Sequence, residues 1–131
     1  MTVIDTSLFI DAQRGREPAK QKLDDLLARP EDLAISAMTI LEVHAAPRMS
    51  AAWARFYAKV FEDLEVLDLD AEAAEDGARL ARDMARRGFK LHNADAAIAG
   101  CAARAGASAI VTTDGDFTEL RGIRVEYVQL S

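Results

Sequence analysis

Short, wholly apolar stretches alternate with helix-like stretches along the chain, and this alternation restricts the possible folds more than any other feature. Strands that are apolar on both faces belong in a parallel sheet, because crossover connections place helices on either side of it. The sequence therefore predicts an α/β fold, a three-layer α/β/α sandwich around a short central parallel sheet. The expected strands are Val3–Ile4, Leu33–Ile35, Val66–Leu67 with Leu69, Ala109–Val111 and Val125–Val128.

The intervening stretches have the spacing and the end signals of helices. Thr6 and Ser7, Ser36 and Asn93 are placed to cap helix starts. The expected helices begin after Thr6, span Glu17 to Arg29, run from Ser36 towards Pro47, and span Ser50 to Leu64, Ala71 to Arg87 and Ala94 to Ala105. One of them carries an aromatic stripe at helical spacing, which favours core packing or a groove for a partner protein: Trp53, Phe56, Tyr57 and Phe61.

Size and composition indicate one domain over residues 1–131. The chain has 131 residues, 50% of them hydrophobic and 29% charged, which is ordinary globular usage. The single cysteine, Cys101, rules out an internal disulfide and a thiolate metal cage, and we expect a cytoplasmic protein. The first residues lack the basic start of a signal peptide, and no apolar run approaches the roughly 20 residues of a membrane span. No membrane partner is expected.

Acidic residues follow three of the expected strands. Asp5 directly follows the first strand, Glu42 lies on the first turns of the helix after the second, and Asp114 and Asp116 follow the fourth. Asp95 opens a helix on an otherwise apolar face, which directs its carboxylate towards the sheet or the edge of the core. Because functional groups gather at the carboxyl ends of parallel strands, we expect these acids to lie together.

Crowded carboxylates repel one another unless a cation neutralises them. Ligands that are all oxygen select Mg²⁺ or Mn²⁺ over zinc or copper, and Mg²⁺ keeps coordination positions for water and substrate phosphate. One or two such ions can activate water and stabilise a leaving oxygen, which is the chemistry of a nuclease. Taken singly, each acid has a structural alternative: helix cap for Asp5, surface position for Glu42, helix-dipole partner for Asp95, turn residue for Asp114.

Four motifs, spread over residues 2 to about 128, resemble those of the PIN-domain ribonucleases, and within them the VapC-type toxins of toxin–antitoxin pairs. They are VIDTSLFID with Asp5, ISAMTILEV with Glu42, NADAAIAGCA with Asp95, and IVTTDGDF. The resemblance implies a Mg²⁺- or Mn²⁺-dependent endonuclease for single-stranded RNA, the toxin of a type II system. It also implies a homodimer and a cognate antitoxin that blocks the site.

The resemblance assigns expected roles to individual residues. Asp5, Glu42 and Asp95 match the first three family acids, and the fourth falls on Asp114 or Asp116, between which the sequence does not choose. Three hydroxyl residues match polar positions that orient the acids or a metal-bound water: Thr6, Ser7 and Thr112.

Two basic clusters are candidate RNA contacts, with a solvated helix face as the alternative for each. The net charge of -6 does not oppose RNA binding, because removal of the five proposed site acids from 22 Asp and Glu leaves 17 against 16 Lys and Arg. The first cluster is Arg82, Arg86, Arg87 and Lys90, and the second is Arg14, Arg16, Lys20 and Lys22.

Two other classes of function are alternatives to a nuclease. A phosphatase of the haloacid dehalogenase type would place a second aspartate where Ser7 stands, so this class loses support. A catalytically silent PIN-like module that binds metal, RNA or a partner protein remains the alternative.

Overall fold

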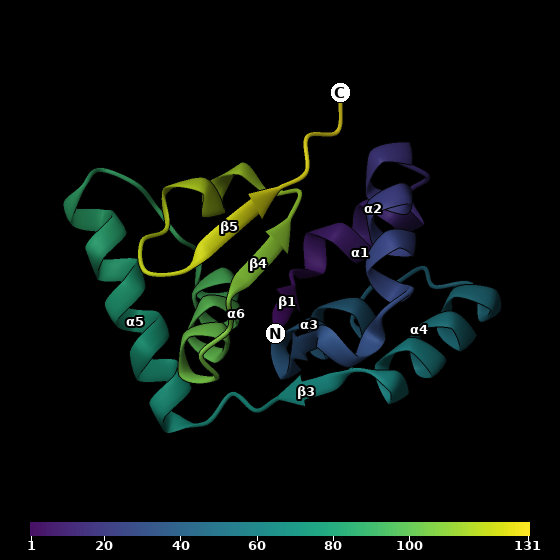
Figure 1. Ribbon diagram of the computed structural model, residues 1–131, viewed down its shortest axis with the longest axis horizontal. Coiled ribbons are helices and arrows are strands. Elements are labelled where there is room, and N and C mark those ends of the chain that lie inside the picture. Colours follow the sequence, from purple (N-terminus) through teal and green to yellow (C-terminus); the bar gives the residue numbers. More distant parts are fainter.

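A computed structural model describes residues 1–131 and contains one five-stranded sheet. The strands are β1 (Thr2–Ile4), β2 (Leu33–Ser36), β3 (Glu65–Leu67), β4 (Ala109–Thr112) and β5 (Arg124–Tyr127). All neighbours in the order β3-β2-β1-β4-β5 are parallel (Figure 1). β2 and then β3 lie on one side of β1, whereas β4 and then β5 lie on its other side. The strand order therefore switches direction between β1 and β4, and the carboxyl ends of these two strands lie at the switch point.

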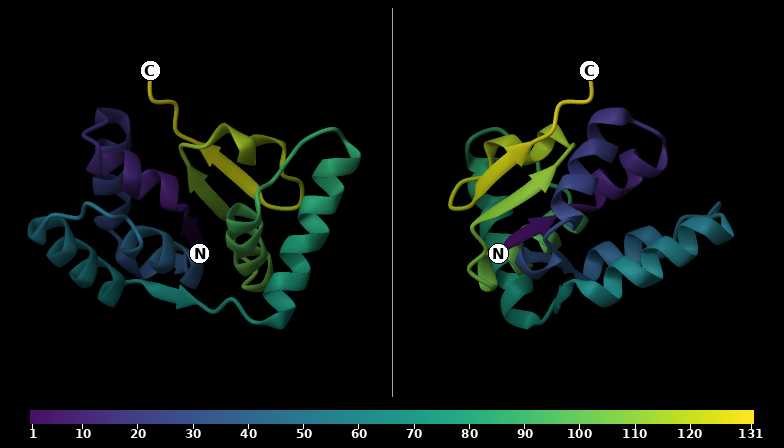
Figure 2. Two further views of the ribbon diagram at one scale, coloured as in Figure 1. Left: turned by 180° about the vertical axis from the view of Figure 1, so that it is seen from behind. Right: turned by 45° about the vertical axis from the view of Figure 1, so that its right-hand side comes forward.

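Helices cover both faces of this sheet (Figure 2). Successive side chains of a strand point to opposite faces, so Val3 packs with α5 and α6 while Ile4 packs with α1, α2 and α4. The predicted three-layer sandwich is therefore confirmed. The helices are α1 (Thr6–Gln13), α2 (Glu17–Leu27), α3 (Ala37–His44), α4 (Ala51–Asp63), α5 (Ala71–Arg86) and α6 (Asn93–Arg104), with 3-10 turns η1 (Pro30–Asp32) and η2 (Gly115–Glu119).

Two glycines bring the backbones of α5 and α6 into contact. A Cβ added to Gly100 would overlap the carbonyl oxygen of Ala73 and the backbone of Gly77, and one added to Gly77 would overlap the carbonyl oxygen of Ala96. No side chain separates the two helices at this crossing. The position of α6, and with it that of Asp95 in its first turn, is fixed by backbone packing.

One of the capping predictions is confirmed and the others are wrong. Ser36 caps α3 as expected, since its hydroxyl accepts from the amide of Met38 at 3.0 Å. Asn93 does not cap α6; it is the first helical residue. Thr6 and Ser7 do not cap α1 either, because their hydroxyls bond to carboxylates.

The aromatic stripe of α4 packs mainly inward. Tyr57 is fully buried against Phe9, and its hydroxyl donates to Gln13 at 2.7 Å. The other three aromatic residues of the stripe are partly buried against the same core. Cys101 is buried, as a small core residue would be. No helix is at once long enough and apolar enough to cross a membrane.

Candidate functional site

Four of the five predicted acids line a single cleft of about 240 Å³ at the carboxyl edge of the sheet. Asp5 follows β1, Asp114 follows β4, Glu42 lies on α3 after β2, and Asp95 lies in the first turn of α6. Each acid is thus delivered by a different segment. The remaining wall of the cleft consists of Thr6, Ser7, Ile10, Asp11 and Arg14.

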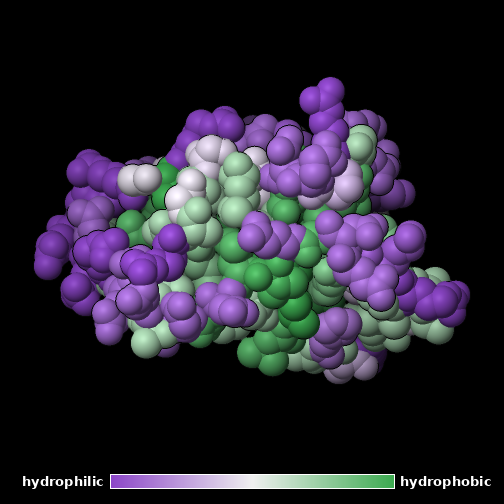
Figure 3. All heavy atoms as spheres, turned by 60° about the horizontal axis from the view of Figure 1, so that its bottom comes forward, coloured by the Kyte–Doolittle hydropathy of each residue, from purple (hydrophilic) through white to green (hydrophobic).

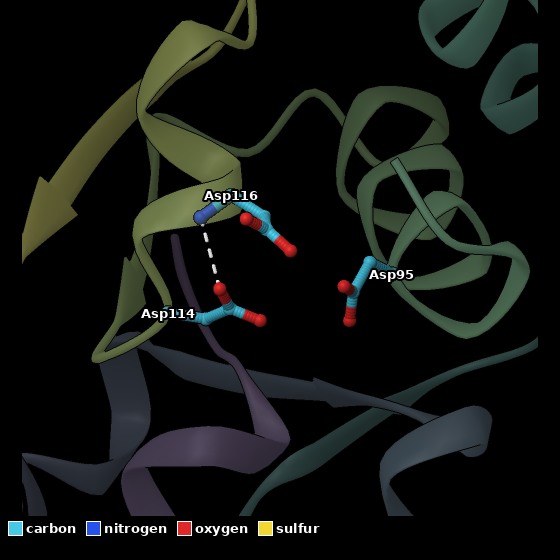
Figure 4. A group of neighbouring side chains, drawn as sticks. All are labelled: Asp95, Asp114 and Asp116. Carbon is cyan, nitrogen blue, oxygen red and sulfur yellow. Dashed lines mark hydrogen bonds between the residues drawn. The ribbon is translucent and has the colours of Figure 1, made fainter. Parts of the chain in front are cut away.

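The fifth predicted acid, Asp116, joins two members of this cleft from the outside. Asp95, Asp114 and Asp116 each offer a carboxylate oxygen, and the three oxygens lie within 4.8 Å of one another. Figure 4 shows the three carboxylates around a shared space, with Asp95 approaching from α6 and the other two from the turn after β4. In that turn the amide of Asp116 donates to Asp114 Oδ1 at 2.9 Å. Asp114 therefore belongs both to the cleft and to this outer group.

Two hydroxyls hold the buried carboxylate of Asp5, which is 2% exposed. Ser7 Oγ and Thr112 Oγ1 donate to Asp5 Oδ2 at 2.6 and 2.8 Å. These hydroxyls in turn accept backbone amides, Ser7 from Thr113 at 3.0 Å and Thr112 from Asp114 at 2.9 Å. The two hydroxyl oxygens also lie 3.1 Å from each other, so both hydroxyls and the Asp5 carboxylate form one network. Ser7 and Thr112 therefore fix Asp5 through Oδ2 and leave Oδ1 free of hydroxyl donors.

Glu42 is held by the hydroxyl of Thr6, which also contacts the hydroxyl of Thr39. Thr6 Oγ1 donates to Glu42 Oε1 at 2.7 Å and lies 2.9 Å from Thr39 Oγ1. Thr39 is fully buried, so its hydroxyl has no access to solvent. Thr39 was not predicted from the sequence, although it stands three residues before Glu42 and so shares a helix face with it.

Asp11 is a further acid of the cleft that was not predicted from the sequence. Its carboxylate accepts from Thr113 Oγ1 at 2.5 Å, which ties α1 to the end of β4. The available signal was helical spacing, because Ser7, Asp11 and Arg14 follow one another at steps of four and three along α1. All three residues line the cleft.

The electrostatics of the cleft favour a bound cation. Burial raises the pKa of Asp5, although the hydroxyls of Ser7 and Thr112 oppose the rise. Burial, and then the neighbouring carboxylates with Asp5 first among them, raise the pKa of Asp95 to about 7. No lysine or arginine forms an ion pair with any of the five predicted acids. Donors that are all carboxylate oxygens suit a hard divalent ion such as Mg²⁺ or Mn²⁺.

Only one member of the first basic cluster has its charge engaged by other groups of the protein. Arg87 donates to Asp83 at 2.8 Å and to the carbonyl oxygen of Glu119 at 2.7 Å, and its guanidinium lies 5.8 Å from the centre of the Phe89 ring. This arginine is therefore engaged within the protein rather than free for a phosphate. The other members, Arg82, Arg86 and Lys90, are exposed and form no ion pair.

The members of the second basic cluster also differ in their surroundings. Lys22 pairs with Glu126 at 2.7 Å, whereas Arg14 lines the acidic cleft. Arg16 and Lys20 are exposed.

Comparison with known proteins agrees with this architecture. The pattern of the PIN domain family matches residues 2–123. The chain is 32% identical over 126 residues to "Ribonuclease VapC5" of Mycobacterium tuberculosis, covering 92% of this chain and 87% of that protein. The crystal structure of DNA-bound VapBC from Salmonella typhimurium matches with a TM-score of 0.73 and 27% identity over 98% of each chain. That of VapBC-5 from Mycobacterium tuberculosis matches with a TM-score of 0.67 and 28% identity, over 98% of this chain and 97% of that one. With four acidic motifs on a matching fold, the chain belongs to the PIN-domain family.

Proposed function

We propose that this protein is a metal-dependent endoribonuclease that cleaves single-stranded RNA and serves as the toxin of a type II toxin–antitoxin pair. One observation carries the proposal: Asp5, Glu42, Asp95 and Asp114 line one cleft, and no basic side chain pairs with any of them. The similarity to a ribonuclease and to toxin–antitoxin complexes supports the assignment of RNA as substrate.

The residues present fit one or two divalent ions. Asp95, Asp114 and Asp116 offer oxygens close enough to share one ion, and Asp5 and Glu42 complete the cleft beside them. When bound, Mg²⁺ or Mn²⁺ supplies Lewis-acid chemistry that acidifies a water molecule and neutralises charge on the phosphodiester. In the absence of an ion, Asp95 holds a proton over much of the range below its pKa of about 7.

The surrounding residues prepare the cleft for this chemistry. Ser7 and Thr112 fix the orientation of Asp5, and Thr6 does the same for Glu42. Because Asp5 is only 2% exposed, the RNA strand has to bend to bring the phosphate to be cleaved into the cleft. A flexible single strand does so at lower cost than a stiff duplex. The buried position of Asp5 thus supports a single-stranded substrate.

Two surface grooves with apolar residues in their walls are candidate sites for the proposed protein partners. A groove of about 460 Å³ between α2 and α4 has apolar walls at Phe56 and Val60 and charged residues at Arg55, Lys59 and Asp63, and we propose it for the antitoxin. A second groove of about 380 Å³, lined by Met38, Leu69 and alanines of α5 and α6, is offered for a second copy of the chain. Figure 3 shows a broad apolar area in the middle of the face that it presents. We further propose a cytoplasmic location, where RNA is available.

The decisive experiment is cleavage of a labelled single-stranded RNA pool in Mg²⁺ or Mn²⁺. Cleavage should disappear in EDTA and in Asp5→Asn, while Asp24→Asn, which removes an exposed carboxylate from α2, should cleave like the wild type. An Asp5→Asn variant as active as the wild type would contradict the proposal.

The alternative, a catalytically silent PIN-like module, makes a different prediction for the same samples. The wild type would cleave no RNA, and calorimetry would show whether Mn²⁺ still binds. Absence of both cleavage and Mn²⁺ binding would favour a role as an interaction module.

A further inference from the structure

We propose that Arg14 and Arg48 bind backbone phosphates of the RNA next to the one that is cleaved, and so define the path of the strand out of the acidic cleft. This inference rests on the proposed ribonuclease function. On one side of the cleaved phosphate, the RNA strand would follow a groove bordered by α1 and by the loop between α3 and α4.

The acidic cleft continues into a second hollow. Ile10 and Arg14 line both, so the two hollows adjoin along the exposed side of α1. The second hollow has a volume of about 380 Å³, and its other walls are Gln13, Ala46, Pro47 and Arg48. It contains no carboxylate. A strand that leaves the acids along this groove therefore passes from a negative to a positive environment.

Arg14 is the only basic residue in the wall of the acidic cleft, and it forms no ion pair. The acid nearest to it along α1, Asp11, is bonded to Thr113 instead. An arginine among several carboxylates ordinarily pairs with one of them. Left unpaired, its planar guanidinium keeps the donors that grip a phosphate with two parallel hydrogen bonds.

A structural role for Arg14 is the competing explanation. Arg14 occupies the C-cap of α1, where a positive charge interacts favourably with the helix dipole. That explanation does not extend to Arg48, which follows α3 in a loop, is exposed and also forms no ion pair. Two unpaired arginines along one groove are expected of a phosphate track, in which a strand contacts successive cations.

The test measures RNA binding and cleavage in Arg14→Ala, Arg48→Ala and the matched control Arg29→Ala. Arg29 is exposed, forms no ion pair and immediately precedes η1 and β2, so it lies at the opposite edge of the sheet. Binding is followed by fluorescence anisotropy with a labelled single-stranded RNA. An Asp5→Asn background prevents cleavage during the titration, and each titration is repeated at several salt concentrations.

Loss of one phosphate contact should weaken binding about five- to tenfold at low salt and reduce the slope of log K against log salt by about 0.7. In the cleavage-competent background, Arg14→Ala and Arg48→Ala should raise KM with little change in kcat, because a neighbouring phosphate is bound equally in the ground and transition states. Arg29→Ala should match the wild type in every measurement.

The results separate this inference from the function on which it rests. If the wild type cleaves RNA while Arg14→Ala and Arg48→Ala behave like Arg29→Ala, the phosphate track is wrong and the ribonuclease stands. Absence of metal-dependent cleavage by the wild type would overturn both.

Discussion

Replacement of Asp95 by asparagine should stabilise the metal-free protein at neutral pH, because the fold opposes ionisation of this carboxylate. Burial is the largest cause, followed by the charges of Asp5, Asp114, Glu42 and Asp116. An asparagine has nearly the same shape and no charge. The variant should therefore keep the packing of α6 while relieving the repulsion within the cleft.

The magnitude follows from the difference in pKa between the folded and unfolded chain. A rise from 3.8 to about 7 corresponds to about 4 kcal/mol at about 1.4 kcal/mol per pH unit. Asp95 is only half-buried and solvent screens part of this penalty, so we expect about 2 kcal/mol. Between these two pKa values the unfolded chain binds fewer protons than the folded one, so the stability of the wild type falls as pH rises through that window.

Urea denaturation in EDTA, followed by circular dichroism, measures this effect. Asp95→Asn should match the wild type near about pH 4 and exceed it by about 2 kcal/mol, or about 6 °C in Tm, near about pH 7.5. Asp24→Asn on α2 is the control for loss of an exposed carboxylate. Mn²⁺ should stabilise the wild type more than Asp95→Asn by mass action. An Asp95→Asn variant no more stable than the wild type near about pH 7.5 would refute the reasoning.

Two further predictions concern packing and positioning. Gly100→Ala should destabilise the fold by about 3 kcal/mol, despite the higher helix propensity of alanine, because its Cβ would overlap the α5 backbone. Chemical denaturation checks this against Gly115→Ala, whose Cβ meets nothing within 4 Å, and equal stability of the two variants would contradict it. Thr39→Val should lower kcat about tenfold and stability by about 1 kcal/mol, since Thr6 loses its hydroxyl neighbour and holds Glu42 less firmly. Thr39→Ser should restore both, and a Thr39→Val enzyme with wild-type kcat would count against a positioning role.

The layers and the strand order could be predicted to different degrees. Apolar runs such as Leu33–Ile35 and Ala109–Val111 identify buried strands locally, so the α/β/α sandwich follows from the sequence alone. The pairing of β1 with both β2 and β4 depends on contacts between residues far apart in the chain, which no local pattern encodes. The backbone contact at Gly77 and Gly100 is a property of two helices together and is likewise invisible in either helix alone.

The site shows the same division between local and long-range information. The rule that acids gather at strand ends predicted the meeting of Asp5, Glu42, Asp95 and Asp114 in one cleft. For Thr6 and Ser7 the expected capping of α1 was wrong, whereas their hydrogen bonds to Glu42 and Asp5 agree with the role beside the acids that the family resemblance implied. A hydroxyl before a helix is equally suited to capping it or to bonding a carboxylate from another segment. Only the tertiary fold decides between these outcomes.

The central place of β1 in the sheet has a consequence for synthesis of the chain. Val3 pairs with Ile110. The first strand to leave the ribosome, β1, therefore has one unpaired edge until β4 has been synthesised. Asp5 likewise receives its bond from Thr112 only after that residue has been made. The cleft is therefore completed late, when β4 and the turn after it join β1 in a long-range pairing. A nascent or truncated chain that ends before β4 would carry most of the acids and still be harmless to the RNA around it.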